Sequence, residues 1–123
     1  MDEITTIQTL KDRVRAFCEA RDWDRFHTPK ELAIGLVTEA SELLQEFRFR
    51  SDAEAAAMVR DPAKRTKLAH EAADALYFLL RFCQVTDIDV TTALDAKLRI
   101  NETRYPVERA KGKNLRSDEL HPT

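Results

Sequence analysis

Four carboxylates lie in two short boxes, Glu39-Ala40-Ser41-Glu42 and Glu71-Ala72-Ala73-Asp74, each inside a strongly helical apolar segment. The two acids of each box are three residues apart, so they project from one face of a helix. Two such pairs on neighbouring helices can converge on one hard cation. Four acids that face one another repel strongly unless a metal or another cation neutralises them. The two boxes are therefore the main indication of chemistry in this chain.

The ligand types favour one class of metal. Four carboxylates without imidazole or thiolate make a hard oxygen site, which suits Mg²⁺ or Mn²⁺ better than Zn²⁺. A di-iron bundle uses Glu-x-x-His motifs, whereas His70 points about 100° away from its neighbour Glu71. Spacing alone leaves a second interpretation open, in which both boxes are ordinary surface acids paired with Lys or Arg.

Helices must place the two boxes next to each other. Hydrophobic residues at helical spacing predict four main helices and one short helix. Their approximate ranges are 4–21, 29–50, 62–85 and 90–104, with the short helix at 52–59. Thr28-Pro29 and Asp61-Pro62 are cap-then-proline pairs that start the second and third main helices.

The boxes differ in their surroundings. Glu39 and Glu42 lie along one border of an apolar helix face, where they look into a cleft rather than straight into solvent. The helix of Glu71 and Asp74 is apolar around most of its circumference over residues 68–85, so we expect it to be largely buried. Acids on a buried helix need partners or a metal.

Composition indicates an all-α protein of one domain. The chain has 123 residues, only 2 glycines, 43% hydrophobic and 34% charged residues, which is typical of helices and not of Gly-rich β turns. We expect residues 1–110 to form a single all-α domain and residues 111–123 to form a polar C-terminal tail.

The net charge and hydropathy of the chain limit the kinds of partner that we expect it to bind. A net charge of −2 gives no global attraction to a nucleic acid polymer or to an anionic membrane. No apolar run approaches the roughly 20 residues that span a bilayer, and the acidic start Met1-Asp2-Glu3 is unlike a signal peptide. Cys18 and Cys83 lie at apolar helical positions and are predicted to be small core residues. These features predict a cytoplasmic protein.

Further motifs surround the acid boxes in a familiar order. Arg25-Phe26-His27-Thr28-Pro29 precedes the first box, and Lys97-x-x-Ile100-Asn101 and Arg104-Tyr105-Pro106 follow the second. With the boxes, they resemble the MazG-like superfamily of all-α nucleoside triphosphate pyrophosphohydrolases, in its dCTP pyrophosphatase branch. The resemblance covers about residues 20–110.

The resemblance implies a four-helix-bundle-type fold with one extra short helix. It also implies Mg²⁺-dependent hydrolysis of a nucleoside triphosphate, dCTP or a modified dCTP above all, to the monophosphate and pyrophosphate, in nucleotide-pool sanitation. Carried over by position, Glu39, Glu42, Glu71 and Asp74 are the catalytic metal ligands. The substrate-binding residues implied in the same way are His27, Phe49, Phe78, Lys97, Asn101, Arg104 and Tyr105.

Three departures from the family pattern bear on selectivity. Thr38 stands where many relatives have a further Glu, Phe49 where dCTP-type enzymes often carry Trp, and Phe78 where they often carry Tyr. These changes spare the metal ligands, so the reaction class follows from the resemblance more firmly than the base does.

Other functions and the assembly stay open at this point. Related hydrolases act on other nucleotides, such as a damaged purine triphosphate or phosphoribosyl-ATP, and a non-catalytic helical module that binds nucleotides or partner helices is a further alternative. The apolar helix over residues 68–85 favours self-association. The resemblance also implies an oligomer, for which we predict a homotetramer in preference to a homodimer.

Overall fold

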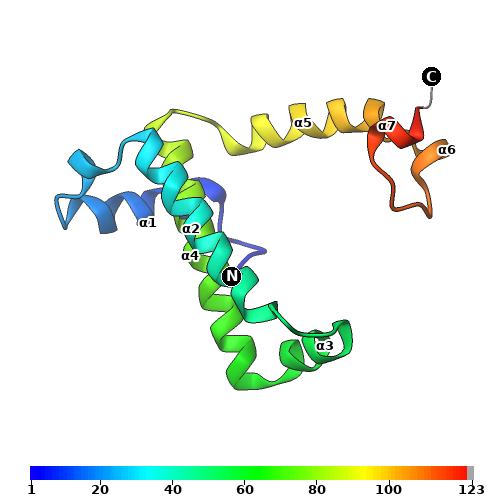
Figure 1. Ribbon diagram of the computed structural model, residues 1–123. Helices are drawn as coiled ribbons and strands as arrows, with labels where there is room; N and C mark the ends of the chain where they lie inside the picture. Colours follow the sequence, from blue (N-terminus) through cyan, green and yellow to red (C-terminus); the bar gives the residue numbers. More distant parts are fainter. Residues whose placement is uncertain (122–123) are drawn as a thin grey trace. The chain divides into compact units, whose positions relative to one another are not determined.

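The protein is all α-helical. The computed structural model describes residues 1–121, which form seven α-helices and one short 3₁₀ helix without any strand (Figure 1). By their internal contacts the residues form two compact units, Met1–Ile88 and a second unit that begins at Asp89. No helix among residues 1–121 is both long and apolar enough to cross a membrane.

The elements of the first unit follow the expected order. They are α1 (Ile7–Glu19), the 3₁₀ helix η1 (Asp24–Phe26), α2 (Pro29–Phe47), α3 (Asp52–Arg60) and α4 (Pro62–Val85). Both predicted helix starts are confirmed, because the Thr28 hydroxyl accepts from the Glu31 backbone N–H at 3.3 Å and the Asp61 carboxylate accepts from that of Lys64 at 2.9 Å. A proline follows each cap at the first helical position.

The second unit contains the predicted last main helix and two short ones. Its elements are α5 (Val90–Arg104), α6 (Val107–Ala110) and α7 (Ser117–Leu120). The sequence pattern did not predict α6 and α7, which are one turn each and too short for hydrophobic periodicity to reveal. The domain of residues 1–110 and its tail stay a prediction, and residues 122–123 of that tail lie outside the described residues. The four-helix bundle also stays a prediction, since α5 belongs to the other unit.

The antiparallel pair α2 and α4 forms the centre of the first unit (Figure 1). Gly35 near the start of α2 packs on Phe78 near the end of α4, and Glu46 near the end of α2 reaches Lys67 near the start of α4. The two acid boxes lie between these two contacts. An α-carbon without a side chain at position 35 lets the α4 aromatic ring approach the α2 backbone.

Few apolar side chains of the single chain are buried. The buried apolar side chains among residues 1–121 are Cys18, Leu32, Met58, Leu80, Cys83 and Leu120. Both cysteines are free, as expected. The expectation that α4 is largely buried is wrong for the single chain, because Leu76 and Leu79 are exposed. The helices α1, α2 and α3 contact α4 but cover only part of its apolar surface.

We predict that Gly35→Ala destabilises the protein. A Cβ at this position overlaps the Phe78 ring, and overpacking typically costs about 1–3 kcal/mol, which exceeds the gain of up to about 1 kcal/mol from better helix propensity. Urea unfolding followed by circular dichroism measures the free energy of unfolding. In a Phe78→Leu background the same substitution should cost less. An equal cost in both backgrounds would show that the ring does not set the requirement for glycine.

Candidate functional site

The antiparallel register of α2 and α4 brings the acid boxes together. One carboxylate oxygen each from Glu39, Glu42 and Glu71 lies within 4.8 Å of the others. The negative charge of Asp74 acts on both Glu39 and Glu71. Helical spacing therefore aligns each pair of acids on its own helix, and the packing of the two helices brings three of the four carboxylates together, while the predicted ligand Asp74 lies outside this group and acts on it through its charge.

The cluster is electrostatically unfavourable in the absence of a cation. Burial raises the pKa of the Glu71 carboxyl above its ordinary value, and the negative charge of Glu42 raises it further. Burial and the neighbouring Glu42 likewise raise the pKa of Glu39. The Oε2 atom of Glu71 is buried without a hydrogen-bond partner. A buried carboxylate oxygen without a partner is costly, so this atom calls for a ligand.

No basic side chain of the described residues forms an ion pair with the cluster. Among the salt bridges of residues 1–121, none joins a Lys, Arg or His within 4.0 Å to Glu39, Glu42, Glu71 or Asp74. Glu46, one turn beyond Glu42, does have such a partner, Lys67 Nζ at 2.8 Å. The interpretation of ordinary paired surface acids thus describes Glu46 and does not describe the four acids of the boxes.

The donor set fits a hard divalent cation. Carboxylate oxygens from two helices, one of them an orphaned buried atom, are the ligands that Mg²⁺ and Mn²⁺ prefer. The exposed Glu42 leaves one side of the cluster open to solvent. Magnesium keeps water and substrate phosphates in its coordination shell, so an open side suits it.

Two aromatic candidates for the substrate pocket differ in position. Phe78 is half-buried, lies one turn after Asp74 on the same side of α4, and meets the Tyr77 ring edge-on at 5.1 Å between centroids. Phe49 follows the end of α2 with its side chain 90% exposed. The Arg48 guanidinium lies 4.6 Å from the centre of the Phe49 ring. The structure thus places Phe78 beside the acids and leaves Phe49 on the surface.

His27 is held by a residue that the sequence analysis missed. Arg81 donates from Nε to Nδ1 of His27 at 3.0 Å, and its other nitrogens donate to Asp24 and Gln84. Arg81 is only 3% exposed. The available signal was a lone Arg within the apolar run Leu79-Leu80-Arg81-Phe82-Cys83, because a cation inside such a run requires buried acceptors.

The remaining predicted substrate residues belong to the second unit. Lys97 is exposed on α5 and Asn101 is half-buried one turn later. The Arg104 guanidinium lies 5.9 Å from the centre of the Tyr105 ring. The backbone carbonyl of Arg104 accepts from Ser117 Oγ at 3.2 Å. Their roles toward the triphosphate stay predictions.

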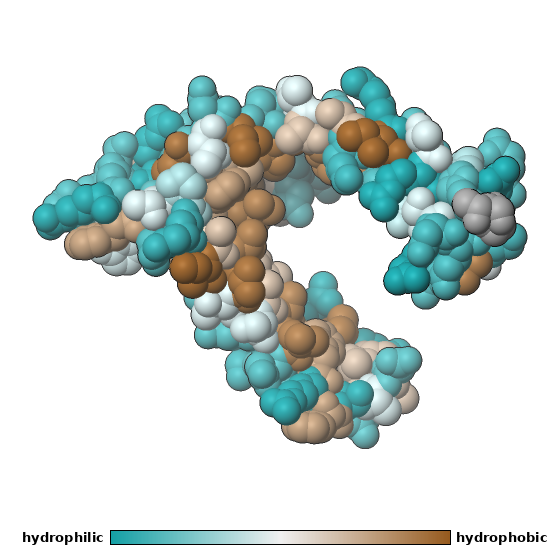
Figure 2. Space-filling view, turned by 45° about the horizontal axis from the view of Figure 1, so that its top comes forward, coloured by the Kyte–Doolittle hydropathy of each residue, from teal (hydrophilic) through white to brown (hydrophobic). Residues whose placement is uncertain are grey.

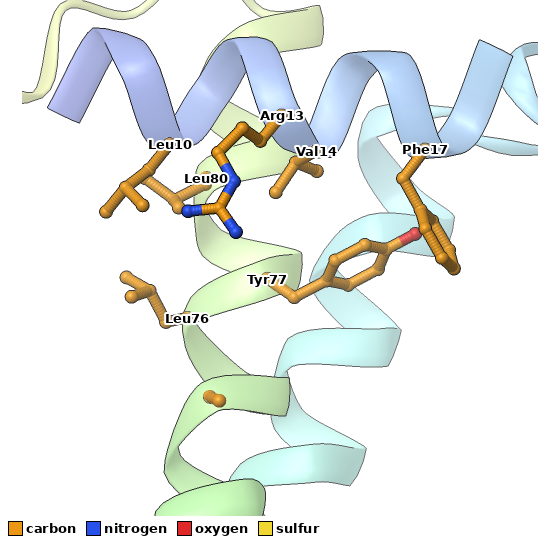
Figure 3. Close-up of a pocket in the computed structure, with 8 residues that line it drawn as sticks. Leu10, Arg13, Val14, Phe17, Leu76, Tyr77 and Leu80 are labelled. Atoms are coloured by element: carbon orange, nitrogen blue, oxygen red, sulfur yellow. The ribbon is translucent and has the colours of Figure 1, made fainter. Parts of the chain in front are cut away.

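A separate apolar groove of about 350 Å³ lies between α1 and α4 (Figure 3). Figure 3 shows Arg13 reaching over it from α1, with Tyr77 pointing toward Phe17. The Tyr77 hydroxyl also lies 3.1 Å from Cys18 Sγ. Burial is the main cause that raises the pKa of this phenol, and the hydrogen bond with Cys18 raises it further. This face of α4 carries none of the four acids, so the groove is not part of the acid cluster.

Similar sequences and a similar solved structure show to which family the chain belongs, although no family model matches it. The chain is 31% identical over 115 residues to dCTP pyrophosphatase 1 of Rattus norvegicus, which covers 94% of this chain and 68% of the relative. The Homo sapiens protein of the same name is 30% identical over the same shares. A crystal structure of a pyrophosphatase from Archaeoglobus fulgidus superimposes with a TM-score of 0.76 at 35% identity, over 81% of this chain and 92% of that one.

These relatives and the acid cluster define the class, an all-α nucleoside triphosphate pyrophosphohydrolase. The chain belongs to the MazG-like superfamily of these proteins, in its dCTP pyrophosphatase branch.

We predict that Mg²⁺ or Mn²⁺ stabilises the protein through the acid cluster. A ligand that binds only the folded state at a hundredfold excess over its Kd contributes about 2.7 kcal/mol, which raises the Tm by several degrees for a chain of this size. Glu71→Gln should melt no lower than the wild type in EDTA, because it removes one of the repelling charges, and should respond less to the metal.

Differential scanning fluorimetry with and without metal measures both effects. Glu31→Gln, the same change at an exposed position of α2, is the matched control and should respond like the wild type. An equal metal response in Glu71→Gln would remove the cluster as the binding site.

Proposed function

We propose that this protein is a Mg²⁺-dependent hydrolase that converts a deoxynucleoside triphosphate to its monophosphate and pyrophosphate, with dCTP or a modified dCTP preferred, in nucleotide-pool sanitation. The buried, unpartnered Glu71 Oε2 within a cluster of carboxylates is the observation that carries this proposal. Membership of the family and the activity for which its relatives are named support it.

The proposed division of labour follows the positions of the residues. Glu39, Glu42, Glu71 and Asp74 hold the metal, which supplies neutralisation of phosphate charge and a polarised phosphoryl group when bound. Glu39 or Glu42 accepts the proton of the attacking water, because Glu42 is exposed at the open side of the cluster and Glu39 lies beside it.

The proposed substrate contacts are those that the family resemblance implies. We assign the phosphates and sugar to Lys97 and Asn101, with Arg104 or Tyr105 assisting, since cations stabilise the charge that develops on phosphate oxygens. The base lies on the side of Phe78 and His27. Phe78 offers a ring face without a hydroxyl, so it stacks on a base without reading its polar edge.

We predict pyrophosphate release from deoxynucleoside triphosphates only in the presence of Mg²⁺. Glu42→Gln and Asp74→Asn should each lower kcat at least about a hundredfold, because each removes a metal ligand, a loss typical of damaged metal sites. Ion chromatography of products from a panel of nucleotides measures the reaction, and circular dichroism checks that the variants fold.

The Glu31→Gln variant should retain full turnover. Release of orthophosphate with a nucleoside diphosphate would contradict the proposed bond cleavage. Full activity of both ligand variants would contradict the assigned metal site.

We also propose that a second copy of the chain covers the exposed apolar side of α2, within a homodimer or the homotetramer predicted above. Ile34, Val37 and Leu44 share this side at helical spacing and are 53%, 69% and 67% exposed. Figure 2 shows hydrophobic side chains gathered over the α2–α4 region. Exposed apolar surface of this extent marks an interaction site.

We predict that Val37→Glu lowers the molar mass of the assembly, because a charge buried in an apolar contact is costly. Size-exclusion chromatography with light scattering measures the mass. Ala53→Glu introduces the same charge at an exposed position of another helix, α3, and should leave the mass unchanged. A wild-type protein that is monomeric at all concentrations would contradict the proposed assembly.

A further inference from the structure

Arg81 is a buried cation that donates a hydrogen bond from each of its three nitrogens. It is 3% exposed and reaches from α4 to the segment that joins α1 to α2. Its Nε donates to His27 Nδ1 at 3.0 Å, one terminal nitrogen donates to Asp24 Oδ1, and the other donates to Gln84 Oε1. The Asp24 carboxylate balances the charge, and Gln84 is itself fixed by donating to the Lys11 carbonyl at 3.1 Å. The guanidinium fork is therefore held in one orientation.

The contact with His27 selects one form of the imidazole. A guanidinium N–H can only donate, so Nδ1 of His27 must accept and cannot carry a proton. A neutral imidazole then carries its proton on Nε2. Burial lowers the pKa of His27, the positive charge of Arg81 lowers it further, and Asp24 partly opposes the shift. The Trp23 ring, 6.1 Å away between centroids, packs beside the imidazole and limits its rotation.

The location of Arg81 connects this arrangement to the acid cluster. Asp74, Phe78 and Arg81 are spaced four and three residues apart, so they project from one side of α4. Seven residues of helix separate Asp74 from Arg81, a rise of about 10 Å. A nucleotide whose phosphates lie at the acids extends its base over a distance of this order, past Phe78 toward His27.

We propose that Arg81 is a positioning residue for base recognition: it fixes His27 as a neutral imidazole whose Nε2–H donates to an uncharged acceptor, a carbonyl oxygen or ring nitrogen, on the base of the nucleotide. The inference rests on the proposed function. An imidazolium would instead attract phosphate, so the fixed neutral form favours the base over the phosphates at this end of the pocket.

The first experiment reads the imidazole directly. In protein with ¹⁵N-labelled histidine, long-range ¹H–¹⁵N spectra should show His27 protonated on Nε2 and neutral down to a pH below the usual imidazole pKa of about 6.5. Arg81→Met should mix the two tautomers and raise the pKa of His27, because it removes both the donor and the positive charge. Asp24→Asn is the matched control. It loosens the same network but keeps the Arg81–His27 bond, so the tautomer should not change.

The second experiment connects the imidazole to the substrate. Arg81→Met should raise KM for the preferred nucleotide roughly five- to tenfold, the value of one hydrogen bond, with kcat within about threefold of the wild type. The same substitution in a His27→Ala background should add little to KM. Arg81→Lys, which keeps the charge but lacks the fork, serves as the second variant if the methionine variant does not fold.

Three results would overturn the proposal. One is an unchanged Nε2–H tautomer in both Arg81 variants, and another is a KM effect that adds fully to that of His27→Ala. The third is an unperturbed His27 Nε2 signal when the α,β-imido analogue of dCTP is added to the wild-type protein. A perturbed signal without turnover of any triphosphate would support the recognition role and defeat only the proposed function.

Discussion

The close packing of α2 against α4 in antiparallel register is the constraint on which the rest of the structure depends. Gly35 accepts the Phe78 ring against the α2 backbone, and this contact sets how near the two helices lie. The same register places Glu39 and Glu42 opposite Glu71. Apolar packing therefore holds together carboxylates that repel one another. The repulsion destabilises the folded state without a metal, and a bound cation would relieve it, which favours cation binding.

Each side of α4 has a different use. The side of Glu71, Asp74 and Phe78 faces α2 and continues to Arg81, while Tyr77 and Leu80 belong to the groove with α1. This division explains why a helix that is apolar around most of its circumference carries a buried arginine. Arg81 ties the connector before α2 to the end of α4 through Asp24 and His27, so the same helix positions both the acids and the imidazole.

Much of the site could be predicted from local spacing, because in a helix the number of residues between two positions determines whether their side chains lie on the same face. The caps at Thr28 and Asp61 are local signals and were confirmed. The pairing of acids within each box followed in the same way. The lone Arg81 in an apolar run signals buried acceptors, but the sequence could not identify them, since Asp24 and His27 are more than fifty residues away along the chain. The burial of α4 was overestimated because periodicity shows which faces are apolar and not which of them a neighbour covers.

The two acid boxes, the all-α class and the family motifs are properties that the sequence by itself determined, since each depends on residue types at short, fixed intervals. Tertiary structure decided which acids lack a basic partner. Glu46 carries the same charge as Glu42 and lies on the same helix, yet Lys67 of α4 forms an ion pair with Glu46 and not with Glu42. It also decided that Glu71 has a buried oxygen without a partner. The physical reason is that desolvation and ion pairing depend on what the neighbouring helix places within a few ångströms, and that distance is set only when α2 and α4 pack.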